Sequence, residues 1–216
     1  MRPFFERSQR FLDLPLETPP RVLLLAALLL LVPAYVAPLW KLTMLAPQQP
    51  AALQLDIYSW KLEGGNGGQD LKEINALNHS IGMRELRASD FTEFKWIPFA
   101  AGVLALLFLR ASVLGRTGTL LDLFVLYVYF GVFSIASFAY KLYTYGHDLA
   151  GNADVKVPPF MPPLAGHQKI ANLDISSSPG AGSYSLAAVA VVVGLALFLA
   201  WRDGSRSLKE DARAAG

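Results

Sequence analysis

Residues 120–140 read LLDLFVLYVYFGVFSIASFAY, a run of 21 residues in which Asp122 is the only charged side chain. A helix rises about 1.5 Å per residue, so this run can cross a hydrocarbon core about 30 Å thick. Within lipid each backbone N–H and C=O must be paired inside its own segment, which favours a helix. Three more apolar runs occupy residues 22–39, 96–114 and 184–201. The sequence therefore predicts an all-α membrane protein with four transmembrane helices.

The overall composition supports this class and excludes several others. The chain is 53% hydrophobic and 17% charged, with a net charge of +2, and its basic residues form no stripe of the kind that binds nucleic acid. It has no cysteine, which excludes disulfides, iron–sulfur clusters and thiolate zinc sites. No histidine lies within the four runs, so they offer no axial ligands for haem. Common catalytic motifs are also absent from the sequence, and we expect no enzyme activity.

The distribution of arginine predicts the orientation in a bacterial inner membrane. Residues 1–21, the turn 115–119 and the tail 202–216 are rich in arginine, which favours the cytoplasmic side for both termini. The two longer segments, 40–95 and 141–183, are then periplasmic loops. A cleavable signal peptide is the alternative for the first run. It fits poorly, because 21 residues that include Glu6, Asp13 and Glu17 precede that run.

The first loop, residues 40–95, contains patterns of secondary structure. Apolar and polar residues alternate from Leu53, which predicts a strand over residues 53–62. The glycines of GGNGG at 64–68 then interrupt the chain. Asp70 and Glu73 have the spacing of a capping box, and the apolar positions that follow predict a short amphipathic helix ending at Gly82. We expect an extracytoplasmic cap built from this strand and helix together with the second loop.

Four prolines stiffen the second loop, residues 141–183. Proline fixes the backbone in an extended form, so this segment is either a brace over the helices or a ready-made docking surface. A Ser/Gly/Pro-rich linker is expected to follow it. The prolines are Pro158, Pro159, Pro162 and Pro163.

Every histidine and every methionine after the first residue falls in the two predicted periplasmic loops. His79 and Met83 are four residues apart, which on a helix puts both on one face. Imidazole and thioether together suit Cu(I), so this pair is a candidate for transient copper binding. The alternative is ordinary packing by Met83 and a hydrogen-bonded surface role for His79. Three further residues are candidates to complete a copper site: His147, Met161 and His167.

Several strings in the loops resemble a known family. They are PLWKLTMLAPQQP at 38–50, GGNGGQDLKEINALNHSIGM at 64–83, and the later YTYGHDL, VKVPPFMPPLAG and KIANL. In these strings the chain resembles the NosB-type membrane proteins of nitrous oxide reductase (nos) gene clusters. The resemblance implies a role beside a periplasmic copper enzyme that reduces nitrous oxide during denitrification.

Two functions of different classes follow from these patterns. The first is a non-enzymatic accessory protein that docks the copper enzyme, or helps it mature, through the periplasmic loops. The second is a structural subunit of a membrane complex that passes electrons from quinol to the periplasm; it would need a partner to hold the haem. A transporter is disfavoured because no ionisable residue lies deep in a run. Besides the four prolines, the expected docking residues are Trp40, Pro47, Gln48, Asn66, Asn75, Asn78, Tyr145 and Asp148.

Overall fold

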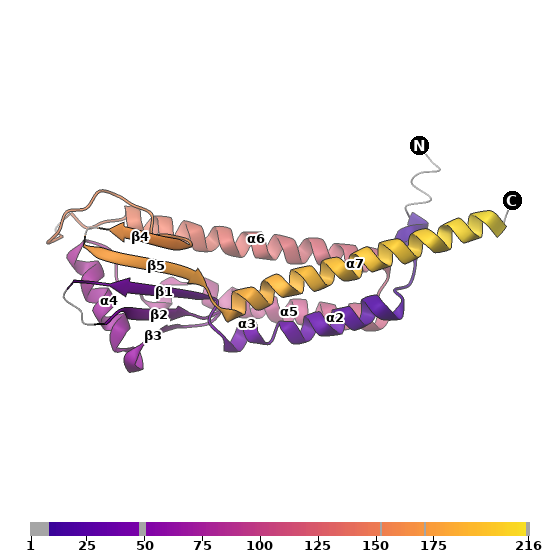
Figure 1. Ribbon diagram of the computed structural model, residues 1–216, viewed down its shortest axis with the longest axis horizontal. Helices are drawn as coiled ribbons and strands as arrows, with labels where there is room; N and C mark the ends of the chain where they lie inside the picture. Colours follow the sequence, from indigo (N-terminus) through magenta and orange to yellow (C-terminus); the bar gives the residue numbers. More distant parts are fainter. Residues whose placement is uncertain (1–8, 48–50, 152, 171, 215–216) are drawn as a thin grey trace. The chain divides into compact units, whose positions relative to one another are not determined.

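The computed structural model describes residues 9–47, 51–151, 153–170 and 172–214 (Figure 1), with side chains described up to residue 207. The chain divides into two compact units. The first is assembled from three separate segments of the chain and the second from two. The first, here called the helix unit, comprises Met1–Val32, Ala100–Gly131 and Ser185–Gly216. The second, here called the sheet unit, comprises Pro33–Phe99 and Val132–Tyr184.

The four predicted apolar helices are confirmed, since the described residues contain four that are long and apolar enough to cross a membrane. The first begins as α2 (Thr18–Leu30) and continues after a turn as α3 (Pro33–Val36). Pro33 lacks the backbone N–H that would continue α2, which accounts for the interruption. The other three extend beyond the predicted runs, and they are α5 (Glu93–Leu114), α6 (Thr117–His147) and α7 (Ala181–Ala214).

The core of the helix unit takes one large side chain or more from each of these four helices. Its fully buried members include Leu24, Phe108, Leu120 and Val193. The Tyr127 hydroxyl on α6 donates to the Leu186 carbonyl on α7 over 2.7 Å. Such a bond satisfies a polar group that would be costly to leave unpaired in an apolar interior.

The sheet unit contains an antiparallel sheet of five strands in the order β3-β2-β1-β5-β4 (Figure 1), so the chain is mostly helical but not all-α, and its cap has more strands than the one predicted. Three strands come from the first loop and two from the second, which confirms that the two loops fold together. The first half of the expected Ser/Gly/Pro linker is in fact the end of β5, which pairs with β1 from Trp40 to Leu45, and its last residues begin α7. The strands are β1 (Trp40–Leu45), β2 (Leu53–Ile57), β3 (Leu62–Gly64), β4 (Gly166–Ile170) and β5 (Leu173–Pro179).

One face of this sheet packs against α4 (Gln69–Ser80), so the predicted amphipathic helix is confirmed. Leu53, Leu55 and Ile74 form a buried cluster between them. The strand predicted over 53–62 is two strands, because the chain turns between β2 and β3. Two short 3₁₀ turns flank this region, η1 (Asn66–Gly68) and η2 (Ala88–Asp90).

The predicted capping box at the start of α4 is wrong. Gly68 is the N-cap residue, with φ 91°, and no side chain caps the helix. The Asp70 carboxylate is buried and instead accepts hydrogen bonds from the Gln54 backbone N–H at 2.8 Å and from the Asn66 amide at 2.7 Å. Asp70 therefore joins the start of α4 to strand β2.

Candidate functional site

The second face of the sheet is open and polar. Residues directly opposite one another on paired strands share a face, and the residues opposite the α4-packed side are mostly hydrophilic. Most of these side chains are exposed and the remainder are half-buried. We call this surface the open face; its residues are Lys41, Thr43, Leu45, Gln54, Asp56, Glu63, His167, Lys169, Asp174, Ser176 and Ser178.

The strand register arranges the open face in rows. The central row contains no acidic residue, lysine or arginine, and it crosses four strands in the order Gln54, Thr43, Ser176, His167. On one side of it Lys41 lies opposite Asp56, and on the other Lys169 lies opposite Asp174. Such a surface offers hydrogen-bond donors and acceptors between pairs of opposite charge. It suits recognition of a polar protein surface better than binding of an apolar ligand.

A small apolar cavity of about 80 Å³ lies on the other side of the sheet. Met44 and Met83 both line it, as do Asn78 and Tyr145 from α4 and α6. Asn78 and Tyr145 are only 2% and 5% exposed, so neither forms part of an outer docking surface. Their burial contradicts the expectation that they contact a partner directly.

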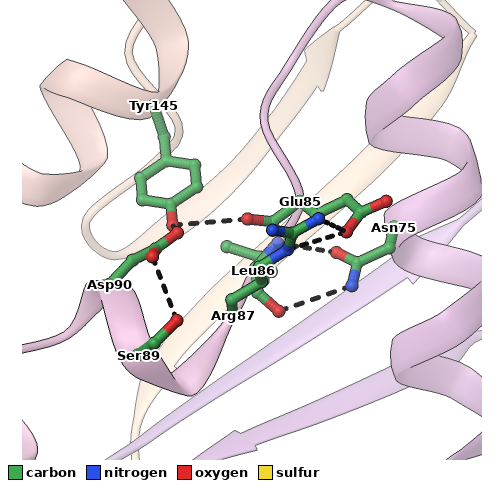
Figure 2. Close-up of polar contacts among 7 residues, drawn as sticks. All are labelled: Asn75, Glu85, Leu86, Arg87, Ser89, Asp90 and Tyr145. Atoms are coloured by element: carbon green, nitrogen blue, oxygen red, sulfur yellow. Dashed lines mark hydrogen bonds and ion pairs between the residues drawn. The ribbon is translucent and has the colours of Figure 1, made fainter.

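A polar network fastens the chain that follows α4 (Figure 2). The Asn75 side chain accepts from the Leu86 N–H at 2.8 Å and donates to the Leu86 carbonyl at 3.4 Å. The Tyr145 hydroxyl lies 3.5 Å from the Glu85 carbonyl and 3.4 Å from the Asp90 carboxylate. We expected both Asn75 and Tyr145 to contact a partner. In the structure their side chains instead hold residues 84–91 in place.

The expected pairing of His79 with Met83 is wrong. Helix α4 ends at Ser80, and Gly82 turns the chain with φ 79°, so Met83 does not follow His79 on a helical face. His79 is exposed, whereas Met83 packs against the buried cluster that contains Ile81 and Ile170. The helical periodicity from which the pair was inferred stops between the two residues.

The other copper candidates lie apart in the fold. His147 stacks on Tyr143 with ring centres 3.8 Å apart, and its Nδ1 is 2.9 Å from the Tyr143 carbonyl oxygen. His167 is on the open face, and Met161 is 40% exposed in the proline-rich segment. Among the residues that the structure describes, no three His, Asp or Glu side chains gather in a way that could hold a metal ion.

The remaining docking candidates divide between surface and interior. Pro47, Pro158 and Pro159 are exposed, as is Asp148, which forms an ion pair with Arg84 at 3.1 Å. Pro162 is buried and Pro163 half-buried, so the proline-rich segment has an inner and an outer side. Trp40 and Asn66 make internal hydrogen bonds to Ser177 and Asp70. Gln48 lies outside the described residues.

The turn between β2 and β3 carries a compact charged and aromatic cluster. Lys61 lies 4.7 Å from the ring centre of Tyr58 and 5.0 Å from that of Trp60, and it donates to Glu63 over 2.6 Å. That hydrogen bond holds the pKa of Glu63 below its usual value. Burial, and then the nearby Glu63 carboxylate, raise the pKa of the Tyr58 phenol. Trp60 also donates to the Tyr35 carbonyl over 3.1 Å, which joins the turn to α3.

Sequence reasoning identified neither the open face nor Ser177. The residues of the open face come from five separate strands, and each of these strands is only three to seven residues long. The fold itself defines the class: a protein with four helices apolar enough to cross a membrane and a separate mixed sheet-and-helix unit. Comparison of the chain with known protein families and with curated proteins finds no match to either.

Proposed function

We propose that this chain is a non-enzymatic accessory protein of the bacterial inner membrane, with both termini in the cytoplasm and the sheet unit in the periplasm. Its partner is the periplasmic copper enzyme that reduces nitrous oxide, which it docks or helps to mature. The loop strings that resemble NosB-type proteins support this choice of partner. Arginine in the segments outside the two loops supports the orientation.

The observation that carries the docking role is the open face. Both polar loops contribute strands to one sheet, and one side of that sheet is uncovered by any described element of the same unit. Its central row of Gln54, Thr43, Ser176 and His167 can exchange hydrogen bonds with a partner, while the flanking charge pairs set the orientation.

The size of the open face predicts a transient contact. Strands about 4.8 Å apart with about 3.4 Å per residue give a five-stranded sheet of this length a face of roughly 400 Å². A stable interface buries about 800 Å² on each partner, so the open face supplies roughly half of that area. The exposed Pro158 and Pro159 are a further surface of the same unit for the remainder.

Co-purification from native membranes tests this function. Because the contact is expected to be transient, membranes are treated with a reversible cross-linker before solubilisation, and the tagged chain is captured. We expect mass spectrometry to identify the nitrous oxide reductase or one of its maturation proteins. A captured cytochrome with a haem spectrum, and no reductase, would instead support the electron-transfer alternative and overturn the docking proposal.

A further inference from the structure

The turn between β2 and β3, residues 58–61, lies beside the end of the first apolar span, Thr18–Val36. Tyr35 belongs to the last turn of that span, and its backbone carbonyl accepts a hydrogen bond from the Trp60 indole N–H over 3.1 Å. The Tyr35 hydroxyl donates to the Pro98 carbonyl, near the start of α5, over 2.6 Å. These two hydrogen bonds place the turn at the level where the first span ends and the second begins.

The Trp60 indole also satisfies a carbonyl of the kind that a helix end leaves unpaired. The last carbonyls of a helix lack partners within it, and a backbone group in an apolar medium needs another donor. Trp60 supplies that donor to Tyr35. The turn itself is closed by a hydrogen bond from the Tyr58 N–H to the Lys61 carbonyl over 2.9 Å. Paired backbone groups of this kind suit a place where water is scarce.

The side chains around this contact have the chemistry of a membrane interface. Trp60 is more than half exposed, and so are Val36 and Phe99. Each of the last two follows a residue of the hydrogen-bonded contact in the chain. A tryptophan ring combines a large apolar surface with one N–H group, and tryptophan is enriched where the headgroups of a bilayer meet its hydrocarbon core. The Trp60 ring is therefore suited to lipid contact, while its N–H group fixes it to the protein.

The charges at the turn compensate one another. The Lys61 ammonium lies over the rings of Tyr58 and Trp60 and pairs with the Glu63 carboxylate at 2.6 Å. Residues 58–61 contain no other charged side chain. The surface is thus aromatic and without net charge, whereas selective binding of anionic lipid requires an excess of basic residues.

We propose that this turn lies in the headgroup layer of the bilayer, with the Trp60 ring among the lipids, and that it holds the β3 edge of the sheet at the membrane surface. β3 is the outermost strand on that side of the sheet. The partner is the lipid surface itself, contacted through an uncharged ring. The inference rests on the membrane placement proposed above, and it does not depend on the docking role of the open face.

Tryptophan fluorescence of the full chain in phosphatidylcholine bilayers tests this position. The chain has four tryptophans, so the difference in emission between the wild type and Trp60→Phe reports on Trp60 alone. The quenchers compared are iodide in the water, a lipid with a nitroxide near the carboxyl end of its acyl chain, and a lipid with the nitroxide near the methyl end. We expect the nitroxide near the carboxyl end to quench Trp60 most. Strongest quenching by iodide, or by the nitroxide near the methyl end, would overturn the proposal.

Trp201, near the end of the fourth span, provides the control for membrane placement. The difference between the wild type and Trp201→Phe should also show quenching by the lipid nitroxides, since the Trp201 ring is exposed. Quenching of Trp201 but not of Trp60 would overturn the position of the turn and leave the membrane placement intact, whereas quenching of neither would overturn both. Phosphatidylglycerol added to the bilayer should leave the quenching of Trp60 unchanged, and a severalfold increase would overturn the uncharged mode of contact.

Discussion

Trp40 donates its indole N–H to the hydroxyl of Ser177 over 2.7 Å, although the two residues are 137 positions apart in the chain. Trp40 begins β1, and Ser177 lies within β5. The same hydroxyl donates to the Leu164 carbonyl at 3.0 Å, next to the proline-rich segment. One buried serine thus joins three parts of the sheet unit that come from two different loops.

Ser177→Ala should weaken the pairing of β1 with β5. The substitution leaves the Trp40 indole N–H and the Leu164 carbonyl without their partner, at a cost of about 1–3 kcal/mol. Hydrogen exchange of the β1 and β5 amides in detergent measures the loss. Ser178→Ala, at the exposed neighbouring position, is the control and should change little. Equal exchange in the two variants would show that this contact is unimportant.

Gly146→Ala should displace the proline-rich segment. An added Cβ at Gly146 would overlap the Phe160 carbonyl and lie 3.0 Å from Pro162, at a point where the Phe160 N–H donates to the Gly146 carbonyl over 3.0 Å. Overpacking of this kind costs about 1–3 kcal/mol. We expect faster proteolysis between residues 154 and 165. Gly151→Ala has no atom in the way and should be cut at the wild-type rate; the same rate in Gly146→Ala would contradict the close packing.

Asp70→Ala should destabilise the sheet unit far more than Glu73→Ala. Asp70 is 2% exposed and accepts two hydrogen bonds, each of which is worth about 1.5–3 kcal/mol when one partner is charged. The Glu73 carboxylate accepts a hydrogen bond from the exposed Gln69 amide over 3.2 Å. The midpoint temperatures of thermal unfolding in detergent, measured for both variants, give the comparison. Similar losses of stability in both variants would favour the capping-box interpretation instead.

The sequence predicts the helices well because their signal is local. Each apolar run is long enough by itself to require a helix in lipid, and α4 has its own apolar periodicity. The helix ends were less predictable: His147 lies seven residues beyond the predicted end of the third run, still within α6. Amphipathic ends of long helices lack the uniform hydropathy that marks their centres.

Most of the sheet was not predicted from the sequence, because strands that pair with each other are far apart in the chain. β5 contains Ser176, Ser177 and Ser178, which are typical of a linker until β1 is known to lie beside them. β1 does alternate, but over only six residues. Strand formation depends on cross-strand neighbours more than on intrinsic preference, and here those neighbours come from the other loop. The predicted His79–Met83 copper pair is wrong for a local reason, because Gly82 has a positive φ and the helix ends before Met83.

Substitutions at His79 and Met83 should have different effects. Met83 is half-buried and packs against the buried cluster, so Met83→Ala should lower stability by about 2 kcal/mol, while the exposed His79 should tolerate alanine. Because the two side chains do not share a helical face, we expect no Cu(I) site that depends on both. Titration of each variant with Cu(I) against a competing chelator is the measurement. A tight site lost equally in both variants would contradict the structure.

Site-specific photo-cross-linking in native membranes tests the docking role of the open face most directly. A photoreactive amino acid replaces Lys41 or His167 on the open face, or Lys72 on the exposed side of α4 as the control. The account predicts adducts with the nitrous oxide reductase or one of its maturation proteins from the two open-face positions, and few from residue 72. Adducts from position 72 alone, or equally from all three positions, would contradict it.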